Sequence, residues 1–151
     1  PQNAHERVGM TGRLDTVQAA ILLEKMAVFD AETARRRTIA ARYRSALADR
    51  VGFQQVAPGV DPVWSYFCIT HPQRDALKAH LAEDGIGSVA YYSTPTHRHP
   101  AYADLPTDPD GLPETERYGE TLLCLPLHPY LTDAEVARIV DRIRGFAAEA
   151  A

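Results

Sequence analysis

A threonine and an arginine stand in a short loop before the first helical pattern of the chain. Thr11 and Arg13 lie in "GMTGRLD", where two glycines keep the backbone open to approach. A guanidinium binds phosphate or carboxylate groups through paired hydrogen bonds, and a threonine hydroxyl donates one more. The loop is therefore a candidate anion site. The alternative is that Arg13 pairs with Asp15 or another local carboxylate and only shapes the loop.

A second group of polar side chains lies in "AYYSTPTHRHP". Because adjacent residues of a strand face opposite ways, one ring of the pair Tyr91 and Tyr92 can pack inward while the other presents its hydroxyl. His97 and His99 are weak candidates for metal ligands, since no nearby cysteine or carboxylate completes a set. A solvated loop is the simpler interpretation of these histidines.

The remaining reactive side chains favour ordinary structural roles. Lys25 and Lys78 are the only lysines, against fourteen arginines, and both fall in helical patterns as solvated residues. Cys68 and Cys124 sit in apolar strand-like runs, which predicts buried reduced thiols rather than a disulfide or a metal site. The arginine run at 35–37 is most simply an exposed helix face or an interface.

Composition limits the classes of partner and compartment. The chain has 151 residues, 45% of them hydrophobic, and a net charge of −4, which argues against nucleic acid as the main partner. No apolar run approaches the ~20 residues that a membrane span needs. The start, "PQNAHERVG", has neither an apolar signal core nor an initiator methionine. We therefore expect a cytoplasmic protein whose chain begins within a longer protein or after processing.

The patterning predicts an α+β domain with a small, mainly antiparallel sheet and helices on one face. Asp15 and Asp30 are the expected N-caps of two separate leading helices, and Thr132 with Glu135 forms a capping box for the last helix. Helices are expected at about 16–28, 31–50, 72–84, 114–121 and 133–148, and strands at about 63–71, 86–92 and 122–127.

Five motifs in order resemble one enzyme family along essentially the whole chain. They are "G-x-x-x-R-L-D-x-x-Q-A-A-I-L" over 9–22, "RR" in the following helix, "RDAL…L…GI" over 74–86, "YYSTPTHRHPAY" over 91–102 and "E…LCLPLHPYLTDAE" over 120–135. Together they resemble the C-terminal part of DegT/StrS-type sugar aminotransferases, which use pyridoxal 5'-phosphate. The resemblance implies the C-terminal domain of the aspartate-aminotransferase (fold type I) fold. Residues 1–29 would be an interface loop and connecting helix, and residues 30–151 the small domain.

The resemblance also implies roles for the polar groups described above. In this family the loop before the "RLD" helix reaches across a homodimer to the partner's cofactor phosphate, so Thr11 and Arg13 would be cofactor contacts. Thr11 stands where asparagine is common and offers fewer donors. Tyr91, Tyr92 and His97 match the "YY-x-x-P-x-H" stretch near the substrate, although Ser93 departs from the usual proline.

The lysine that binds the cofactor covalently in this family has no counterpart in the chain, because neither Lys25 nor Lys78 stands in its motif. The resemblance therefore implies a fragment, inactive alone, of an enzyme that moves an amino group from glutamate to a nucleotide-linked keto-sugar. Such chemistry serves polysaccharide or secondary-metabolite sugar biosynthesis. Two alternatives stay open: a stand-alone non-catalytic binding or assembly domain, and a fragment of a related sugar dehydratase.

Overall fold

A computed structural model describes residues 9–10 and 12–146 of the chain, and the expected cofactor contact Thr11 lies outside the described residues. The chain forms two compact units, of which the first ends at Ala31 and the second begins at Glu32. In the described ranges no helix is long and apolar enough to cross a membrane. The domain roles expected from the resemblance, with a boundary after residue 29, stay predictions.

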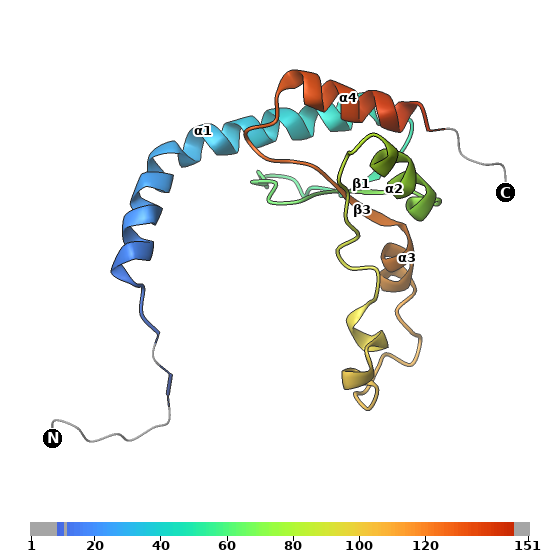
Figure 1. The fold of residues 1–151 in the computed structure, drawn as a ribbon. Coiled ribbons are helices and arrows are strands. Elements are labelled where there is room, and N and C mark those ends of the chain that lie inside the picture. Colours follow the sequence, from blue (N-terminus) through green and yellow to red (C-terminus); the bar gives the residue numbers. More distant parts are fainter. Residues whose placement is uncertain (1–8, 11, 147–151) are drawn as a thin grey trace, which may run out of the picture. The chain divides into compact units, whose positions relative to one another are not determined.

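The leading segment forms one helix, α1 (Thr16–Ala46), where two were expected (Figure 1). It begins directly after Asp15, as predicted, and the Asp15 carbonyl accepts the amide of Ala19 at 2.8 Å. The predicted break at Asp30 was wrong. No proline or glycine interrupts α1, and an aspartate inside a helix costs only about 0.7 kcal/mol relative to alanine, too little to end it.

The part of α1 that belongs to the first unit exposes many apolar side chains. Between Thr16 and Ala31 the burial pattern is exposed at every residue but one. The large exposed side chains here are Val17, Ile21, Leu22, Leu23, Met26, Val28 and Phe29. Helical stability in proteins comes mostly from packing of an apolar face, and this stretch has little of it within the described chain.

Amides of Val17–Phe29 should therefore exchange with solvent faster than those of Val136–Ile143 in the 151-residue chain. The second stretch contributes four buried side chains to the core, so its amides open only with the domain. Hydrogen exchange followed by mass spectrometry measures both. Equal protection of the two stretches would contradict this expectation.

The second unit contains a three-stranded antiparallel sheet in the order β1 (Gly52–Phe53), β2 (Phe67–Thr70) and β3 (Leu122–Leu125). The strands expected around 63–71 and 122–127 are confirmed as β2 and β3. The strand expected over 86–92 was wrong: within the described segment only Val89 pairs, through a single bridge to Cys124. Glycine is depleted in strands because it offers no side chain to pack, and Gly87 interrupts this run. The third strand is β1 instead, just beyond the end of α1.

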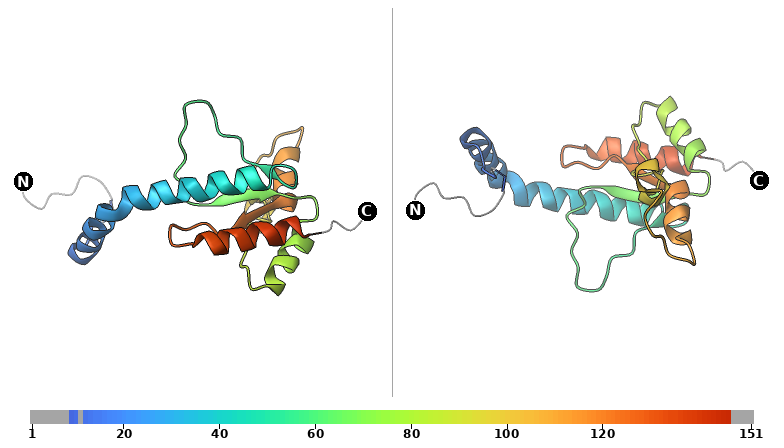
Figure 2. Two further views of the ribbon diagram at one scale, coloured as in Figure 1. Left: turned by 90° about the horizontal axis from the view of Figure 1, so that it is seen from above. Right: turned by 90° about the horizontal axis from the view of Figure 1, so that it is seen from below.

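One face of the sheet carries the core of the second unit. Phe67 and Ile69 of β2 and Leu123 and Leu125 of β3 point to this face and are buried. The second half of α1 and α4 (Asp133–Arg144) lie side by side over the sheet (Figure 2). These two helices and α2 (Arg74–Glu83) contribute apolar side chains to the core. They are Ile39, Ala40, Tyr43, Leu77, Leu81, Val136, Ile139, Val140 and Ile143. The predicted α+β class, a small antiparallel sheet with the core-forming helices on one face, is confirmed.

The remaining helices begin and end near the residues expected from the sequence. The helix α2 (Arg74–Glu83) ends before Gly85, whose φ of 69° lies in the left-handed region that favours glycine. The helix α3 (Pro113–Thr121) leads directly into β3. The capping box of α4 is present, and α4 ends at Arg144, earlier than the expected residue 148. Gly145 follows at the C-cap.

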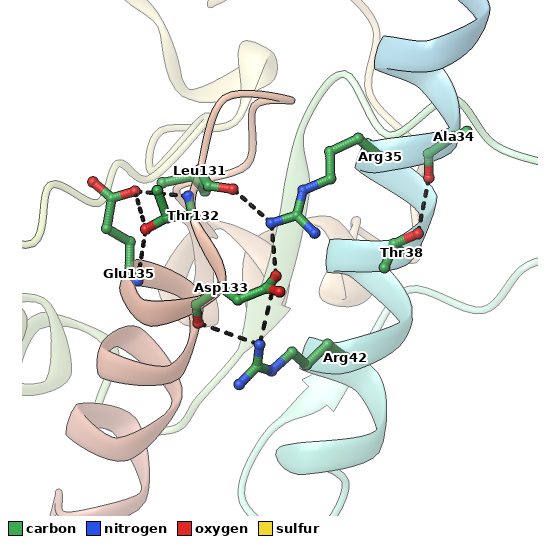
Figure 3. A network of polar contacts seen from close by, with 8 residues as sticks. All are labelled: Ala34, Arg35, Thr38, Arg42, Leu131, Thr132, Asp133 and Glu135. Carbon is green, nitrogen blue, oxygen red and sulfur yellow. Dashed lines mark hydrogen bonds and ion pairs between the residues drawn. The ribbon is translucent and has the colours of Figure 1, made fainter.

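The arginine run of α1 is bonded within the chain rather than simply exposed. Arg35 donates to the Leu131 carbonyl at 2.6 Å and to the Asp133 carboxylate at 2.8 Å, and Arg42 donates to the Asp133 carbonyl at 3.2 Å (Figure 3). Arg36 donates to the carbonyls of Trp64 and Leu127. These bonds fix the second half of α1 to the segment that enters α4.

Candidate functional site

The polar stretch singled out in the sequence lies beside α3, on the side of the sheet away from α4 (Figure 1). There it borders a hollow of about 360 Å³. Its lining residues are Tyr91, Tyr92, Thr94, Pro95, Thr96, His99, Thr115, Tyr118, Gly119 and Leu122. Tyr91 and Tyr92 are thus brought together at one hollow, whereas His97 does not line it. The α3 residues were missed by sequence reasoning because a helix beside a long loop gives no signal of which face meets the loop.

Tyr91 and Tyr92 both keep exposed rings, at 40% and 78% of their free surface. The expectation that one ring packs in the core was wrong, because these residues follow the Val89 bridge in a turn rather than in a strand. Tyr91 contacts Tyr66 edge to face, with 5.2 Å between ring centroids, and lies 5.5 Å from the Tyr92 ring. The peptide bond between Tyr91 and Tyr92 is cis. The three tyrosines form a cluster of exposed side chains.

His97 is held by a carboxylate of α3. Its Nε2 atom lies 3.0 Å from the Glu116 Oε1 atom, and its side chain is 18% exposed. Arg98 forms a fork on the same carboxylate, with distances of 2.7 and 2.6 Å from Nη2 to the two oxygens. The guanidinium of Arg98, and then His97, lower the pKa of Glu116. Across the residues described, no three histidine, cysteine or acidic side chains are grouped to hold a metal ion.

Replacing Glu116 by glutamine should remove an acid-dependent component of stability. The folded pKa of Glu116 lies below its ordinary value of 4.5, so its stabilising contribution is complete above that value and is lost as pH falls through the folded pKa. Urea unfolding between about pH 2 and pH 7 should show a smaller acid loss for Glu116→Gln than for the native chain. Glu114→Gln, which loses the Arg117 pair on the same helix, is the matched comparison. An equal loss of unfolding free energy at acid pH in the native and Glu116→Gln chains would contradict the assignment.

Two residues, Gly119 in the wall and Arg74 behind it, position the hollow. Gly119 of α3 approaches the stretch so closely that a Cβ atom there would lie 3.0 Å from the Ser93 carbonyl oxygen. Arg74 is 7% exposed and donates to the Gly119 and Leu122 carbonyls at 3.3 and 3.1 Å. Its Nε atom forms an ion pair of 2.6 Å with Asp75, at an angle that excludes an aligned hydrogen bond. Sequence reasoning found "RDAL" as a motif but not this buried anchor.

The other candidate site, at the start of the chain, is described only in part. Arg13 is exposed and forms no ion pair or hydrogen bond with Asp15 or any other residue in the described ranges. Lys25 on α1 and Lys78 on α2 are exposed as well, and neither borders the hollow beside α3. The described chain therefore offers a cation for an anionic group, but no lysine held in a formed pocket.

Comparison with known proteins places this geometry in a family. Residues 1–144 match the DegT/DnrJ/EryC1/StrS aminotransferase family. The chain belongs to this family. The resemblance drawn from the motifs is confirmed, and the match covers both candidate sites.

Two curated relatives of this chain are named as sugar aminotransferases. The dTDP-3-amino-3,4,6-trideoxy-alpha-D-glucose transaminase of Streptomyces venezuelae is 37% identical over 95% of this chain and 38% of the relative. The UDP-2-acetamido-2-deoxy-3-oxo-D-glucuronate aminotransferase of Pseudomonas aeruginosa is 33% identical over 87% of this chain and 36% of the relative.

A solved structure shows the same fold. The crystal structure of a DegT/DnrJ/EryC1/StrS aminotransferase from Brucella abortus superposes with a TM-score of 0.92 and 42% identity, covering 99% of this chain and 40% of that one. The predicted fold class, part of a fold type I aminotransferase, is confirmed. The chain thus spans about two fifths of the length of the relatives it matches.

Proposed function

We propose that the chain is the C-terminal part of a pyridoxal-phosphate-dependent aminotransferase that moves an amino group from glutamate to a nucleotide-linked keto-sugar. The observation that carries the proposal is the family match over residues 1–144, together with relatives named as transaminases of dTDP- and UDP-linked sugars. The complete enzyme would work as a homodimer in the cytoplasm.

The hollow beside α3 supports a role in binding the sugar nucleotide. Three tyrosine side chains, Tyr91, Tyr92 and Tyr118, combine apolar ring faces with hydroxyl groups along its wall. Rings pack against the faces of sugars and bases, while hydroxyls and threonines bond the polar edges of such ligands. His97 lies behind this wall, where its bond to Glu116 holds the 96–98 turn against α3. We therefore propose that His97 acts on substrate indirectly, by holding this wall of the hollow in position.

Arg13 supports a contact with an anionic group, either the cofactor phosphate in the partner subunit or the diphosphate of the substrate. An exposed guanidinium that has no acidic partner among the described residues can form the paired hydrogen bonds that phosphate oxygens accept. When bound, pyridoxal phosphate supplies the electron sink that amino transfer requires. The residues described here do not supply its covalent lysine; they fit a phosphate contact and a substrate wall.

The test is the activity of the complete protein encoded around this chain. Purified protein with glutamate should aminate a dTDP- or UDP-linked 3-keto-sugar, and the product should carry one new amino group by mass spectrometry. Loss of a sugar hydroxyl without amination would instead show a dehydratase. Ligand binding without turnover of any keto-sugar would favour a non-catalytic module. Either outcome would overturn the proposal.

A further inference from the structure

The two cysteines of the chain face each other across the central strands. Cys68 of β2 is paired with Cys124 of β3 in the antiparallel register. Both backbone bonds of Cys124 run to Val89 on its other side, with Cys124 donating at 2.7 Å and accepting at 3.2 Å. Cys68 and Cys124 are therefore a non-hydrogen-bonded pair, the kind in which opposite Cα atoms come within about 4.5 Å. Disulfides join Cα atoms about 4.4–6.8 Å apart, so this register permits one without moving the strands.

The thiols lie on the face of the sheet opposite the core that α1 and α4 cover. Phe67 and Ile69 point into the core, so Cys68 between them points the opposite way and is half-buried. Cys124 is 6% exposed. Cys68 is thus partly open to solvent, whereas Cys124 is nearly covered, so only a small oxidant can reach the Cys124 sulfur. Neither thiol has a part in the function proposed above.

The two sulfurs differ in protonation. The hydrogen bond from Cys68 lowers the pKa of Cys124 to about 7, against the opposing effect of burial, and the Tyr91 backbone amide adds a further bond to the sulfur. The same pairing, and then burial, raise the pKa of Cys68. At neutral pH the pair holds a thiolate beside a thiol, which is the arrangement of a nucleophilic and a resolving cysteine.

We propose that Cys68 and Cys124 form a redox-sensitive modification site that hydrogen peroxide oxidises to a cross-strand disulfide. The Cys124 sulfur attacks one peroxide oxygen, so that an S–O bond forms, the O–O bond breaks and the leaving hydroxide takes up a proton as water. The Cys68 sulfur then attacks the resulting sulfenic sulfur. An S–S bond forms, the S–O bond breaks, and the Cys68 thiol proton leaves with the hydroxyl as a second water. The peroxide gains the two electrons that the dithiol loses.

Oxidation at this site affects the tyrosines that line the hollow through one hydrogen bond, which the Tyr91 backbone amide donates to the Cys124 sulfur. The thiolate that accepts the Tyr91 amide is consumed when the S–S bond forms. Tyr91 follows directly from the Val89 bridge and packs against Tyr66 and Tyr92. The disulfide therefore changes the support of the tyrosine cluster while leaving the helix-covered core intact.

The test uses the reduced 151-residue chain and hydrogen peroxide, followed by N-ethylmaleimide and intact mass spectrometry. The expected product is a monomer lighter by two hydrogens, without maleimide adducts, whose non-reduced digest joins the Cys68 and Cys124 peptides and which dithiothreitol restores. Two maleimide adducts, oxygen adducts on separate cysteines or disulfide-linked dimers would overturn the proposal.

Single variants assign the two roles. In Cys68→Ser, Cys124 should stop at the sulfenic acid and be captured by dimedone, whereas Cys124→Ser should react with peroxide at least tenfold more slowly than the native chain. The amide signal of Tyr91 by NMR should shift on oxidation of the native chain and stay unchanged on the same treatment of Cys124→Ser. Dimedone capture mainly at Cys68, or an unmoved Tyr91 signal in the native chain, would contradict the assignment.

Discussion

Replacing Tyr43 by alanine should destabilise the second unit by about 3–5 kcal/mol, the range found for large aromatic residues removed from packed cores. The Tyr43 ring is fully buried, and it packs against Phe67 with 5.3 Å between ring centroids. Domains of this size are stable by only about 5–15 kcal/mol, so the variant should lose a large share of its stability. Urea unfolding followed by far-UV circular dichroism measures the change.

A smaller substitution separates the ring from its hydroxyl. The Tyr43 hydroxyl donates to the Pro126 carbonyl at 2.9 Å, at the end of β3. Tyr43→Phe keeps the ring and should cost about 1 kcal/mol, the usual worth of one hydrogen bond. Tyr102→Ala, at an exposed tyrosine, should change stability by about 0.5 kcal/mol or less. A Tyr43→Ala chain as stable as Tyr102→Ala would contradict the core described here.

Replacing Arg13 by alanine in the complete enzyme should weaken cofactor retention or raise the substrate KM by about tenfold to a hundredfold. A charge-assisted hydrogen bond to phosphate is worth about 1.5–3 kcal/mol, which corresponds to that range. The variant should keep α1, because the helix begins after Asp15 and does not depend on Arg13. Titration of the cofactor-free enzyme with pyridoxal phosphate, together with steady-state kinetics, measures both effects.

Two further variants show whether the effect belongs to the charge at this position. Arg13→Lys keeps the charge but loses the paired geometry and should recover part of the affinity. Arg37→Ala removes another arginine whose partner is Asp61 within the chain, and both affinities should stay unchanged. Native affinities in Arg13→Ala would instead support the interpretation that Arg13 only shapes the loop.

The fold was predictable where sequence signals are local. Apolar spacing and the Thr132–Glu135 capping box located α4. Aromatic and branched residues located β2, and the apolar run at 122–127 located β3. The break expected at Asp30 failed because an aspartate that can cap a helix can also sit inside one at small cost. The strand β1 has only two residues, and its pairing with β2 depends on contacts distant in sequence.

The candidate site was predictable in its residues but not in its arrangement. The motif spacing singled out Tyr91, Tyr92 and His97, yet only the folded chain turns His97 toward Glu116 and away from the hollow. The cysteines were expected to be buried, which holds for Cys124 but only in part for Cys68. Their register could not be inferred, because no local signal in the sequence fixes which strands pair. Arg74 was missed because nothing local distinguishes a buried arginine from a solvated one.

The central claim is that this chain supplies binding surfaces of an aminotransferase whose covalent cofactor site lies in the rest of the protein. The direct measurement mixes pyridoxal phosphate with the 151-residue chain or with the complete protein, fixes any lysine–cofactor bond by borohydride reduction, and maps the labelled lysine. Covalent capture needs an amine held in a formed pocket, and Lys25 and Lys78 are exposed on helices.

We expect only trace labelling of Lys25 and Lys78 in the 151-residue chain, with no amino transfer from glutamate to a nucleotide-linked keto-sugar. The complete protein should label one lysine outside this chain stoichiometrically and should transfer the amino group. Stoichiometric labelling of Lys25 or Lys78, accompanied by amino transfer in the 151-residue chain alone, would contradict the account.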